Sequence, residues 1–352
     1  MALAGLFHIQ YSRAILALGG VQIISRLRVF FDNFTLILIA VVLAATFIPA
    51  HGVGATIFQW LTNFAIALLF FLHGAKLSRQ AIIAGVMHWR LHILIFACTF
   101  ILFPILMLSL QPLLRPLLGD ELWVGMLYLA ALPGTVQSAI AFTSMARGNI
   151  PAAVCAASAS SLVGILVTPF LVKLMLDADA GTTGMLEAVL RISLQLLLPF
   201  LLGHYMRRWI SGWVERNKSW LKSVDQSSIL LVVYTAFSAA VISGLWTAVS
   251  PSALLILSVV CCVILAIVLV ATTWLARGLK FNKADEITIV FCGSKKSMAT
   301  GIPMASVLFA GGAVGPAILP LMVFHQIQLM VCAVLAQKYA RRCKDESAEC
   351  EY

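Results

Sequence analysis

Late in the chain, one strongly apolar segment carries the sequence Phe291-Cys-Gly-Ser-Lys-Lys-Ser297. An earlier apolar segment carries a related sequence, Leu132-Pro-Gly-Thr-Val-Gln-Ser138. Both fit Gly-[Thr/Ser]-x-x-Ser, followed after six residues by Met-Ala, and the offset between them is 159 residues throughout. Glycine and polar residues weaken a helix, so we expect an unwound stretch in both segments.

The composition places these two segments in a membrane. Apolar residues make up 61% of the 352 residues, charged residues make up 11%, and the mean hydropathy is +1.00. Soluble domains contain roughly 45–50% apolar and about 25% charged residues. These values argue against an ordinary cytosolic enzyme, a disordered chain and a secreted disulfide scaffold. They predict an all-α membrane protein.

Ten segments are long and apolar enough to cross a bilayer, which takes about 20 residues per helix. The predicted spans are about 33–50, 56–75, 90–110, 122–146, 151–172, 187–206, 227–248, 252–276, 285–309 and 315–338. With a cytoplasmic N-terminus, 19 of the 24 Lys and Arg residues lie on the cytoplasmic side and three on the other side. This bias follows the positive-inside rule, places both termini in the cytoplasm and accounts for the net charge of +10 without nucleic acid.

The two related motifs fall in the fourth span of each five-span half. An odd number of spans per half inverts the second half relative to the first, as in many secondary transporters, and corresponding interrupted spans point to a transport site. The alternative is a pair of close helix crossings that need only glycine. The predicted parts are a cytoplasmic or interfacial segment over 1–29, a first repeat over 30–176, an inverted repeat over 177–340 and a cytoplasmic tail over 341–352.

The sequence between the sixth and seventh spans predicts a separate helix on the cytoplasmic surface. Trp209, Trp213 and Trp220 recur there at near-helical spacing among basic residues. An amphipathic helix of this kind lies in the bilayer interface.

Two adjacent lysines inside the ninth span are the most unusual feature. Asn282, Asp285 and Glu286 resemble a capped helix start, which puts Lys295 and Lys296 near the middle of the span. All 14 Asp and Glu residues map to loops, span ends or the tail, so no fixed carboxylate is expected opposite the lysines. Three arrangements stay open: backbone carbonyls and water hold the ammonium groups, one lysine is neutral, or an anionic substrate supplies the missing charge. Adjacent residues point to different helix faces, so the two lysines are expected to differ in role.

The candidate transport site combines the two motifs with polar residues of other spans. It comprises Gly134, Thr135, Gln137, Ser138, Gly293, Ser294, Lys295, Lys296, Ser297, His325, Gln326, Gln328 and Asn63. A cation site, if the chain has one, would use Thr135, Gln137, Ser138, Ser158, Ser160 and Ser161. The cysteines and histidines have no zinc-binding spacing, so no metal or other resident cofactor is predicted, and sodium or a proton is left as the coupling ion.

At these residues the chain resembles the bile acid:sodium symporter family, and most closely its SBF-like branch. The resemblance covers about residues 30–340 and is carried by Leu69–Ser78, Pro133-Gly134, Ala146–Asn149, Phe281–Glu286, Gly293–Ser297 and Phe324–Gln328. It implies a symporter of a small organic anion in the bacterial inner membrane. It also implies ten transmembrane helices in two inverted five-helix repeats, a core and a panel domain, and unwound helices four and nine that cross near the cation sites.

The chain departs from the sodium-binding members of that family at the break in the ninth helix. Those members resemble Glu-x-Gly-x-Gln-Asn-Ser, whereas Phe291 stands here at the Glu position and Lys295 and Lys296 at the Gln and Asn positions. In the fourth helix, Ala139 stands where the family has Asn. Sodium is a hard cation that prefers several oxygen ligands. We therefore expect a lysine ammonium to replace bound sodium; the alternative is sodium-coupled symport through a rebuilt cation site.

Two other classes of function are compatible with parts of the sequence. Ser294 and Ser297 lie beside two lysines, as in an intramembrane hydrolase that uses a Ser–Lys pair. A channel would also contain interrupted helices. The internal repeat already accounts for the polar residues at both breaks, so the sequence favours a transporter over an enzyme. The oligomeric state does not follow from the sequence.

Overall fold

A computed structural model describes residues 33–76, 88–176, 185–242, 244, 250–309 and 314–349. Within these ranges every regular element is a helix and no strand occurs. The chain forms two compact units, Met1–Ala40 and Val41–Tyr352, and the packing below is that of the second unit. The segment predicted over 1–29 lies outside the described residues.

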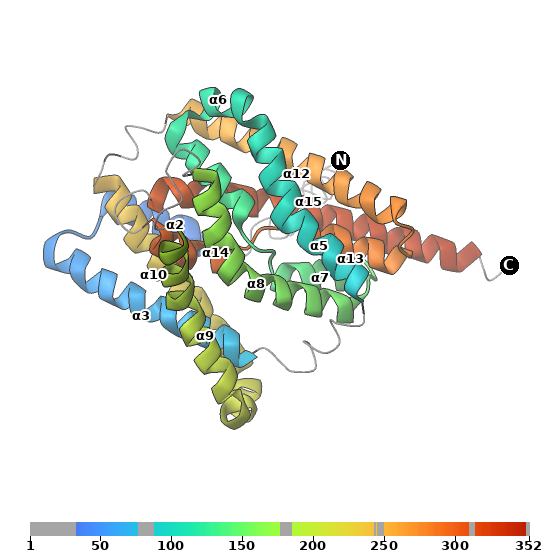
Figure 1. The fold of residues 1–352 in the computed structure, drawn as a ribbon, viewed down its shortest axis with the longest axis horizontal. Coiled ribbons are helices and arrows are strands. Elements are labelled where there is room, and N and C mark those ends of the chain that lie inside the picture. The colour runs from blue at the N-terminus through green and yellow to red at the C-terminus, as the bar shows by residue number, and fades with distance from the viewer. Residues whose placement is uncertain are drawn as a thin grey trace, which may run out of the picture. The chain divides into compact units, whose positions relative to one another are not determined.

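Figure 1 labels the α-helices and colours them along the chain from blue to red. Thirteen helical elements follow one another in the described ranges. They are α2 (Asn33–Phe47), α3 (Gly52–Lys76), α5 (Trp89–Ala97), the π-helical turn η1 (Cys98–Leu102), α6 (Phe103–Ala131), α7 (Gln137–Met145), α8 (Ile150–Leu176), α9 (Met185–Arg216), α10 (Lys218–Ile242), α12 (Pro251–Gly278), α13 (Lys283–Gly293), α14 (Met298–Leu308) and α15 (Val314–Glu349).

Six of the described helical stretches are long and apolar enough to cross a membrane, and the shorter helix Leu36–Phe47 is also apolar. Helices satisfy their own backbone hydrogen bonds, which is the condition for crossing hydrocarbon. The chain is therefore an integral, multi-pass membrane protein.

Both predicted interruptions are present. Helix α6 ends at Ala131 and α7 begins at Gln137, while α13 ends at Gly293 and α14 begins at Met298. The predicted third span and the first part of the predicted fourth span lie in one helical stretch, Trp89–Ala131, which consists of two helices joined across a kink. Its bend is at Gly119, whose φ of 76° and ψ of 164° are accessible to glycine without strain.

The predicted surface helix between the sixth and seventh spans is wrong as a separate element. Helix α9 continues to Arg216 and α10 begins at Lys218, so the tryptophans belong to the ends of two long helices. The early start of α10 also brings Asp225 inside that helix, where its carboxylate pairs with Lys76 of α3. Likewise, α15 extends through the tail predicted from residue 341 as far as Glu349.

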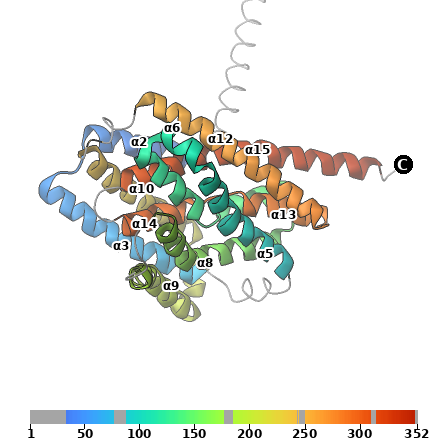
Figure 2. The same ribbon diagram turned by 45° about the horizontal axis from the view of Figure 1, so that its top comes forward.

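The helices of the second unit pack in two groups. Helix α3 packs against α9 and α10, whereas α6, α12 and α14 pack against α15 (Figures 1 and 2). The short helix α13 lies against α12, α7, α5 and α8. The short helix α13 thus packs against both long and short helices, and all of its residues from Asp285 to Gly293 are buried.

Two glycines allow α3 and α9 to touch backbone to backbone. A Cβ atom on Gly74 of α3 would lie 1.9 Å from the carbonyl oxygen of Phe200 of α9. A Cβ atom on Gly203 of α9 would lie 1.9 Å from the carbonyl oxygen of Phe71 of α3. Small residues permit such approaches between membrane helices.

Candidate functional site

The two helix interruptions lie against each other. The Ser297 amide donates a hydrogen bond to the Pro133 carbonyl at 2.9 Å. A Cβ atom on Gly134 would lie 3.2 Å from the Cys292 carbonyl oxygen, so glycine permits the close approach. The Gly134 amide donates to Ser160 Oγ of α8 at 3.1 Å. Motifs that are 159 residues apart in the sequence therefore form one structural site.

A network of hydrogen bonds and ion pairs around the buried Asp285, Glu286 and Thr288 fixes the start of α13. The Asn282 side chain accepts a hydrogen bond from the Asp285 amide at 2.8 Å, which confirms the predicted helix cap. Asn149, at the start of α8, donates from Nδ2 to Asp285 Oδ1 at 2.8 Å and from its amide to Thr288 Oγ1 at 3.0 Å. Arg277 and Lys283 pair with the buried Glu286. This network sets the direction in which α13 approaches the break.

Lys296 is held by main-chain carbonyl groups. Its Nζ donates hydrogen bonds of 2.7–2.8 Å to the carbonyl oxygens of Thr99, Ala130 and Leu132. The Phe103 ring centroid lies 4.1 Å from the same nitrogen. An ammonium group has three donors, so all three are satisfied although the side chain is 0% exposed. Protein dipoles, rather than a carboxylate, stabilise the buried charge.

The three carbonyls are available for reasons that the sequence explains. Ala130 and Leu132 lie where α6 ends, and the last carbonyls of a helix have no intrahelical donor. In the π-helical turn, the Phe103 amide donates to the Cys98 carbonyl. The next donor in that register would be Pro104, which has no N–H. The Thr99 carbonyl is therefore left for Lys296.

Lys295 lies in different surroundings. Its Nζ donates one hydrogen bond, to the Ser138 carbonyl at 3.2 Å, and lies 3.7 Å from the Phe142 ring centroid and 5.4 Å from that of Phe291. The side chain is 0% exposed. Within the described part of the chain, neither Lys295 nor Lys296 forms a salt bridge. The two lysines thus have different partners: Lys296 meets three carbonyl groups, whereas Lys295 meets one carbonyl group and two aromatic rings.

Gln328 of α15 braces the backbone at the second break. Its Oε1 accepts from the Lys296 amide at 3.0 Å, and its Nε2 donates to the Lys296 carbonyl at 2.9 Å. His325 Nδ1 accepts a hydrogen bond of 2.9 Å from Gln328 Nε2. The side chain of Gln326, on the same helix, is half-buried. Gln328 and His325 therefore position the peptide group of Lys296 rather than its ammonium.

The two serines beside the lysines serve the backbone. Ser294 Oγ donates to the Val290 carbonyl at 2.6 Å, and Ser297 Oγ accepts from the Thr300 amide at 3.3 Å as the cap of α14. Each hydroxyl is thus hydrogen-bonded to its own helix, and the lysine amines donate to carbonyls instead. This geometry gives no support to a Ser–Lys hydrolase.

Three of the hydroxyl groups considered for a cation site, those of Thr135, Ser138 and Ser160, make hydrogen bonds of their own. Thr135 Oγ1 and Ser138 Oγ are 2.7 Å apart and bond to each other. Ser160 Oγ accepts a hydrogen bond from the Gly134 amide, whereas Ser161 Oγ is buried with no hydrogen-bond partner among the described residues and Ser158 is half-buried. The remaining predicted residues are exposed: Gln137 at the start of α7, and Asn63 on α3, where Gln59 Nε2 donates to its Oδ1 at 3.2 Å.

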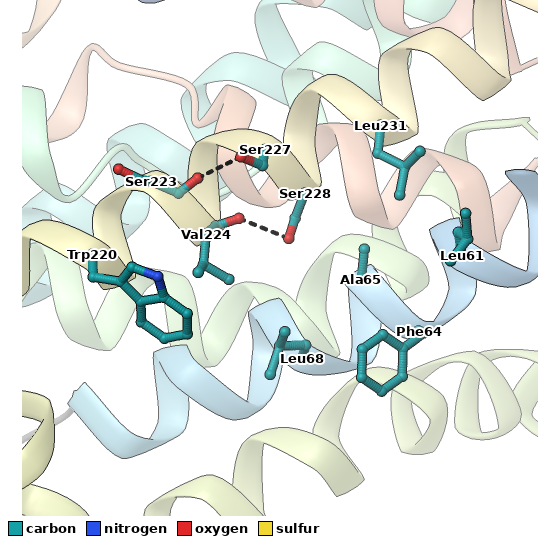
Figure 3. A pocket seen from close by; sticks show the side chains of 10 residues that line it. All are labelled: Leu61, Phe64, Ala65, Leu68, Trp220, Ser223, Val224, Ser227, Ser228 and Leu231. Atoms are coloured by element: carbon teal, nitrogen blue, oxygen red, sulfur yellow. Dashed lines mark hydrogen bonds between the residues drawn. The ribbon is translucent and has the colours of Figure 1, made fainter. Parts of the chain in front are cut away.

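A groove of about 360 Å³ lies between α3 and α10, away from the lysines. Figure 3 shows its apolar wall from α3 and a serine-rich wall from α10, where Ser227 and Ser228 bond to carbonyls of their own helix. None of the predicted site residues lines it. The lining residues are Leu61, Phe64, Ala65, Leu68, Trp220, Ser223, Val224, Ser227, Ser228 and Leu231.

Several residues of the lysine site were not anticipated. Thr99, Phe103 and Phe142 contact the two ammonium groups, yet none of them is among the residues that the sequence predicts for the site. One signal was present, because Pro104 inside an apolar span removes a backbone donor. The consequence of Pro104 for the Thr99 carbonyl depends on the π-helical hydrogen-bond register, which cannot be predicted from the sequence.

Comparison with known proteins gives consistent results. The model of the SBF-like CPA transporter family matches residues 32–341. The chain is 67% identical over 324 residues to an uncharacterized protein of Pseudomonas aeruginosa, covering 92% of this chain and 97% of the relative. It is 60% identical over 321 residues to the Escherichia coli protein named "Putative symporter YfeH" (91% and 96%). It is 30% identical over 274 residues to sodium/bile acid cotransporter 7 of Rattus norvegicus (77% and 80%).

Proposed function

Because the chain belongs to the SBF-like CPA transporter family, we propose that it is a secondary active symporter that moves an organic anion by alternating access. Two relatives support this proposal through their names, one a symporter and the other a sodium/bile acid cotransporter. The observation that carries it is the meeting of two interrupted helices around buried, positively charged side chains. Interrupted helices that meet within the membrane form the binding sites of secondary transporters.

The proposal assigns the role of a resident cation to Lys296. Carbonyl groups at the ends of half-helices coordinate sodium in other secondary transporters, because they carry the negative end of the helix dipole. Here the Lys296 ammonium donates hydrogen bonds to three carbonyl oxygens, two of them at the end of α6. A covalently attached positive charge leaves a bound sodium ion with no role there. Transport would then proceed without sodium, and a proton is the coupling ion that fits.

The proposed topology has ten transmembrane helices in two inverted five-helix repeats, divided into 30–176 and 177–340. The division falls between α8, which ends at Leu176, and α9, which begins at Met185. The motif at the break after α6 and the motif at the break after α13 are 159 residues apart, which supports an internal repeat. Helices α3, α9 and α10 would belong to the panel, and the helices from α5 to α8 and from α12 to α15 to the core. The charge bias and the two bacterial relatives favour an inner membrane with both termini in the cytoplasm.

Counterflow in proteoliposomes tests this function. Vesicles that contain the purified full chain are loaded with one of a panel of unlabelled organic anions, beginning with a bile acid anion, and uptake of the labelled anion is measured. We expect saturable uptake that loading accelerates, at equal rates in sodium and in choline of matched ionic strength. A transporter exchanges its cargo across both faces, which a channel or a hydrolase does not do.

Protein-free vesicles are the control for leakage. Uptake that rises linearly with anion concentration and ignores the internal anion would contradict the transporter proposal. Uptake that requires sodium would be consistent with the transporter proposal but would contradict the assignment of Lys296 as the resident cation.

A further inference from the structure

The two buried lysines differ in how many acceptors their ammonium groups meet. Each ammonium can donate three hydrogen bonds. Lys296 donates three, to carbonyls of Thr99, Ala130 and Leu132, whereas Lys295 donates a single bond of 3.2 Å, to the Ser138 carbonyl. Two donors of Lys295 thus have no acceptor among the described residues. An acceptor that arrives with the substrate would complete this set.

The described residues that contact the Lys295 ammonium include no carboxylate that would compete with a substrate anion. Helix α7 contributes the Ser138 carbonyl and the Phe142 ring, and α13 contributes Phe291. The titratable groups that interact with the ammonium are the thiols of Cys292 on α13 and Cys332 on α15. One layer further out, the ring of Tyr339 on α15 lies 6.0 Å from that of Phe291, and its hydroxyl donates to Glu286 at 3.5 Å. Two aromatic rings beside an ammonium favour an anion that is attached to a flat, apolar body.

The side of the Lys295 ammonium that Phe142 covers borders accessible surface. Phe142 is half-buried and lies on α7, a helix of nine residues that begins at the break. On the same helix, Gln137, Ala141 and Ser144 are exposed and share one face by their spacing of four and three residues. Polar residues within a membrane segment face water-filled cavities or protein rather than lipid. Phe142 is thus a partly exposed residue in contact with the buried Lys295 ammonium.

We propose that Lys295 is the residue that binds the anionic group of the substrate and that the Phe142 ring covers it when no substrate is bound. The substrate is an organic anion whose carboxylate or sulfonate is attached to a flat apolar body. This inference rests on the proposed function, because it names the anion-binding group of that same transport site. Lys296 stays on its three carbonyls throughout the transport cycle.

Chemical labelling of the folded full chain tests the proposal without the natural substrate. The probe is trinitrobenzenesulfonate, a flat aromatic sulfonate whose ring carbon is attacked by an amine, with loss of sulfite and release of a proton to water. Peptide mass spectrometry then measures the arylation of each lysine. We expect Lys295 to be labelled several-fold faster in Phe142→Ala than in the unsubstituted chain, and unreactive benzenesulfonate to slow this labelling in both.

Matched variants separate access from general loosening. Phe170→Ala removes an exposed phenylalanine of α8 and should leave Lys295 labelling unchanged, and the exposed Lys338 should react equally in every sample. Phe142→Leu keeps an apolar side chain without the ring. It replaces Phe142→Ala in the labelling experiment if the melting temperature of Phe142→Ala is too low for folded protein to be labelled. We expect it also to accelerate labelling of Lys295.

The outcomes distinguish this inference from the proposed function. Lys295 that stays unlabelled in both Phe142 variants, or labelling that benzenesulfonate does not slow, would overturn the inference while counterflow transport stands. Labelling of Lys296 in the folded protein would instead contradict its assignment as the resident cation. Absence of counterflow would contradict the proposal that the chain is a transporter.

Discussion

Replacing Lys296 with methionine is expected to lower the melting temperature of the purified protein strongly or to prevent folded protein from accumulating. Methionine keeps an unbranched apolar chain but donates no hydrogen bond. The carbonyls of Thr99, Ala130 and Leu132 would then be buried without the donor that now serves them. A buried unsatisfied group costs about 1–3 kcal/mol, so the three together cost at least about 3 kcal/mol. Folded proteins are stable by only about 5–15 kcal/mol.

Lys338→Met is the matched control for that experiment. Lys338 lies on α15 and is exposed, so its replacement should leave the melting temperature almost unchanged. Thermal unfolding in detergent, followed by loss of monodisperse protein on size-exclusion chromatography, compares the two variants. Equal melting temperatures for Lys296→Met and Lys338→Met would show that the carbonyl contacts contribute little.

The second large effect is expected from Gly203→Ala, where α9 crosses α3. The added Cβ atom would lie 1.9 Å from the Phe71 carbonyl oxygen, a backbone atom that cannot rotate away. The two helices must separate, and the reciprocal contact between Gly74 and Phe200 would open with them. Because helix association in a membrane depends on close packing, we expect the folded fraction to fall sharply.

Gly212→Ala on the same helix provides the comparison. A Cβ atom there meets nothing within 4 Å, so alanine should be tolerated and should stabilise the helix by up to about 1 kcal/mol. Melting temperatures and the yields of monodisperse protein measure both variants. If Gly203→Ala melts as high as Gly212→Ala, the described crossing of α3 and α9 is incorrect.

Much of the fold follows from local properties of the sequence. Long apolar segments predict membrane helices, and glycine with polar residues in mid-span predicts the breaks before Gln137 and before Met298. Helix ends were less predictable. The tryptophans Trp209, Trp213 and Trp220 among basic residues suggest a separate surface helix, although α9 and α10 extend into that region as continuous helices. Helical propensity and packing, rather than hydropathy, decide where such helices end.

The site was predictable in its chemistry but not in its contacts. Lys295 and Lys296 stand out in the sequence because charge is rare inside a span. Their partners lie far away along the chain: Ser138 is 157 residues from Lys295, and Thr99 is 197 residues from Lys296. The sequence indicated that the two lysines differ in role. Which of them meets the carbonyl groups depends on the tertiary crossing of the two breaks.

The most direct test of the resident ammonium is the melting temperature of the unsubstituted chain in sodium chloride and in choline chloride at equal ionic strength. A ligand that binds only the folded state stabilises it by RT ln(1 + [L]/Kd). With the Lys296 ammonium on the carbonyls, we predict the same melting temperature in both salts over the whole range of sodium concentration. A saturable rise that sodium alone produces would contradict this account, because it would require a sodium site beside an occupied ammonium site.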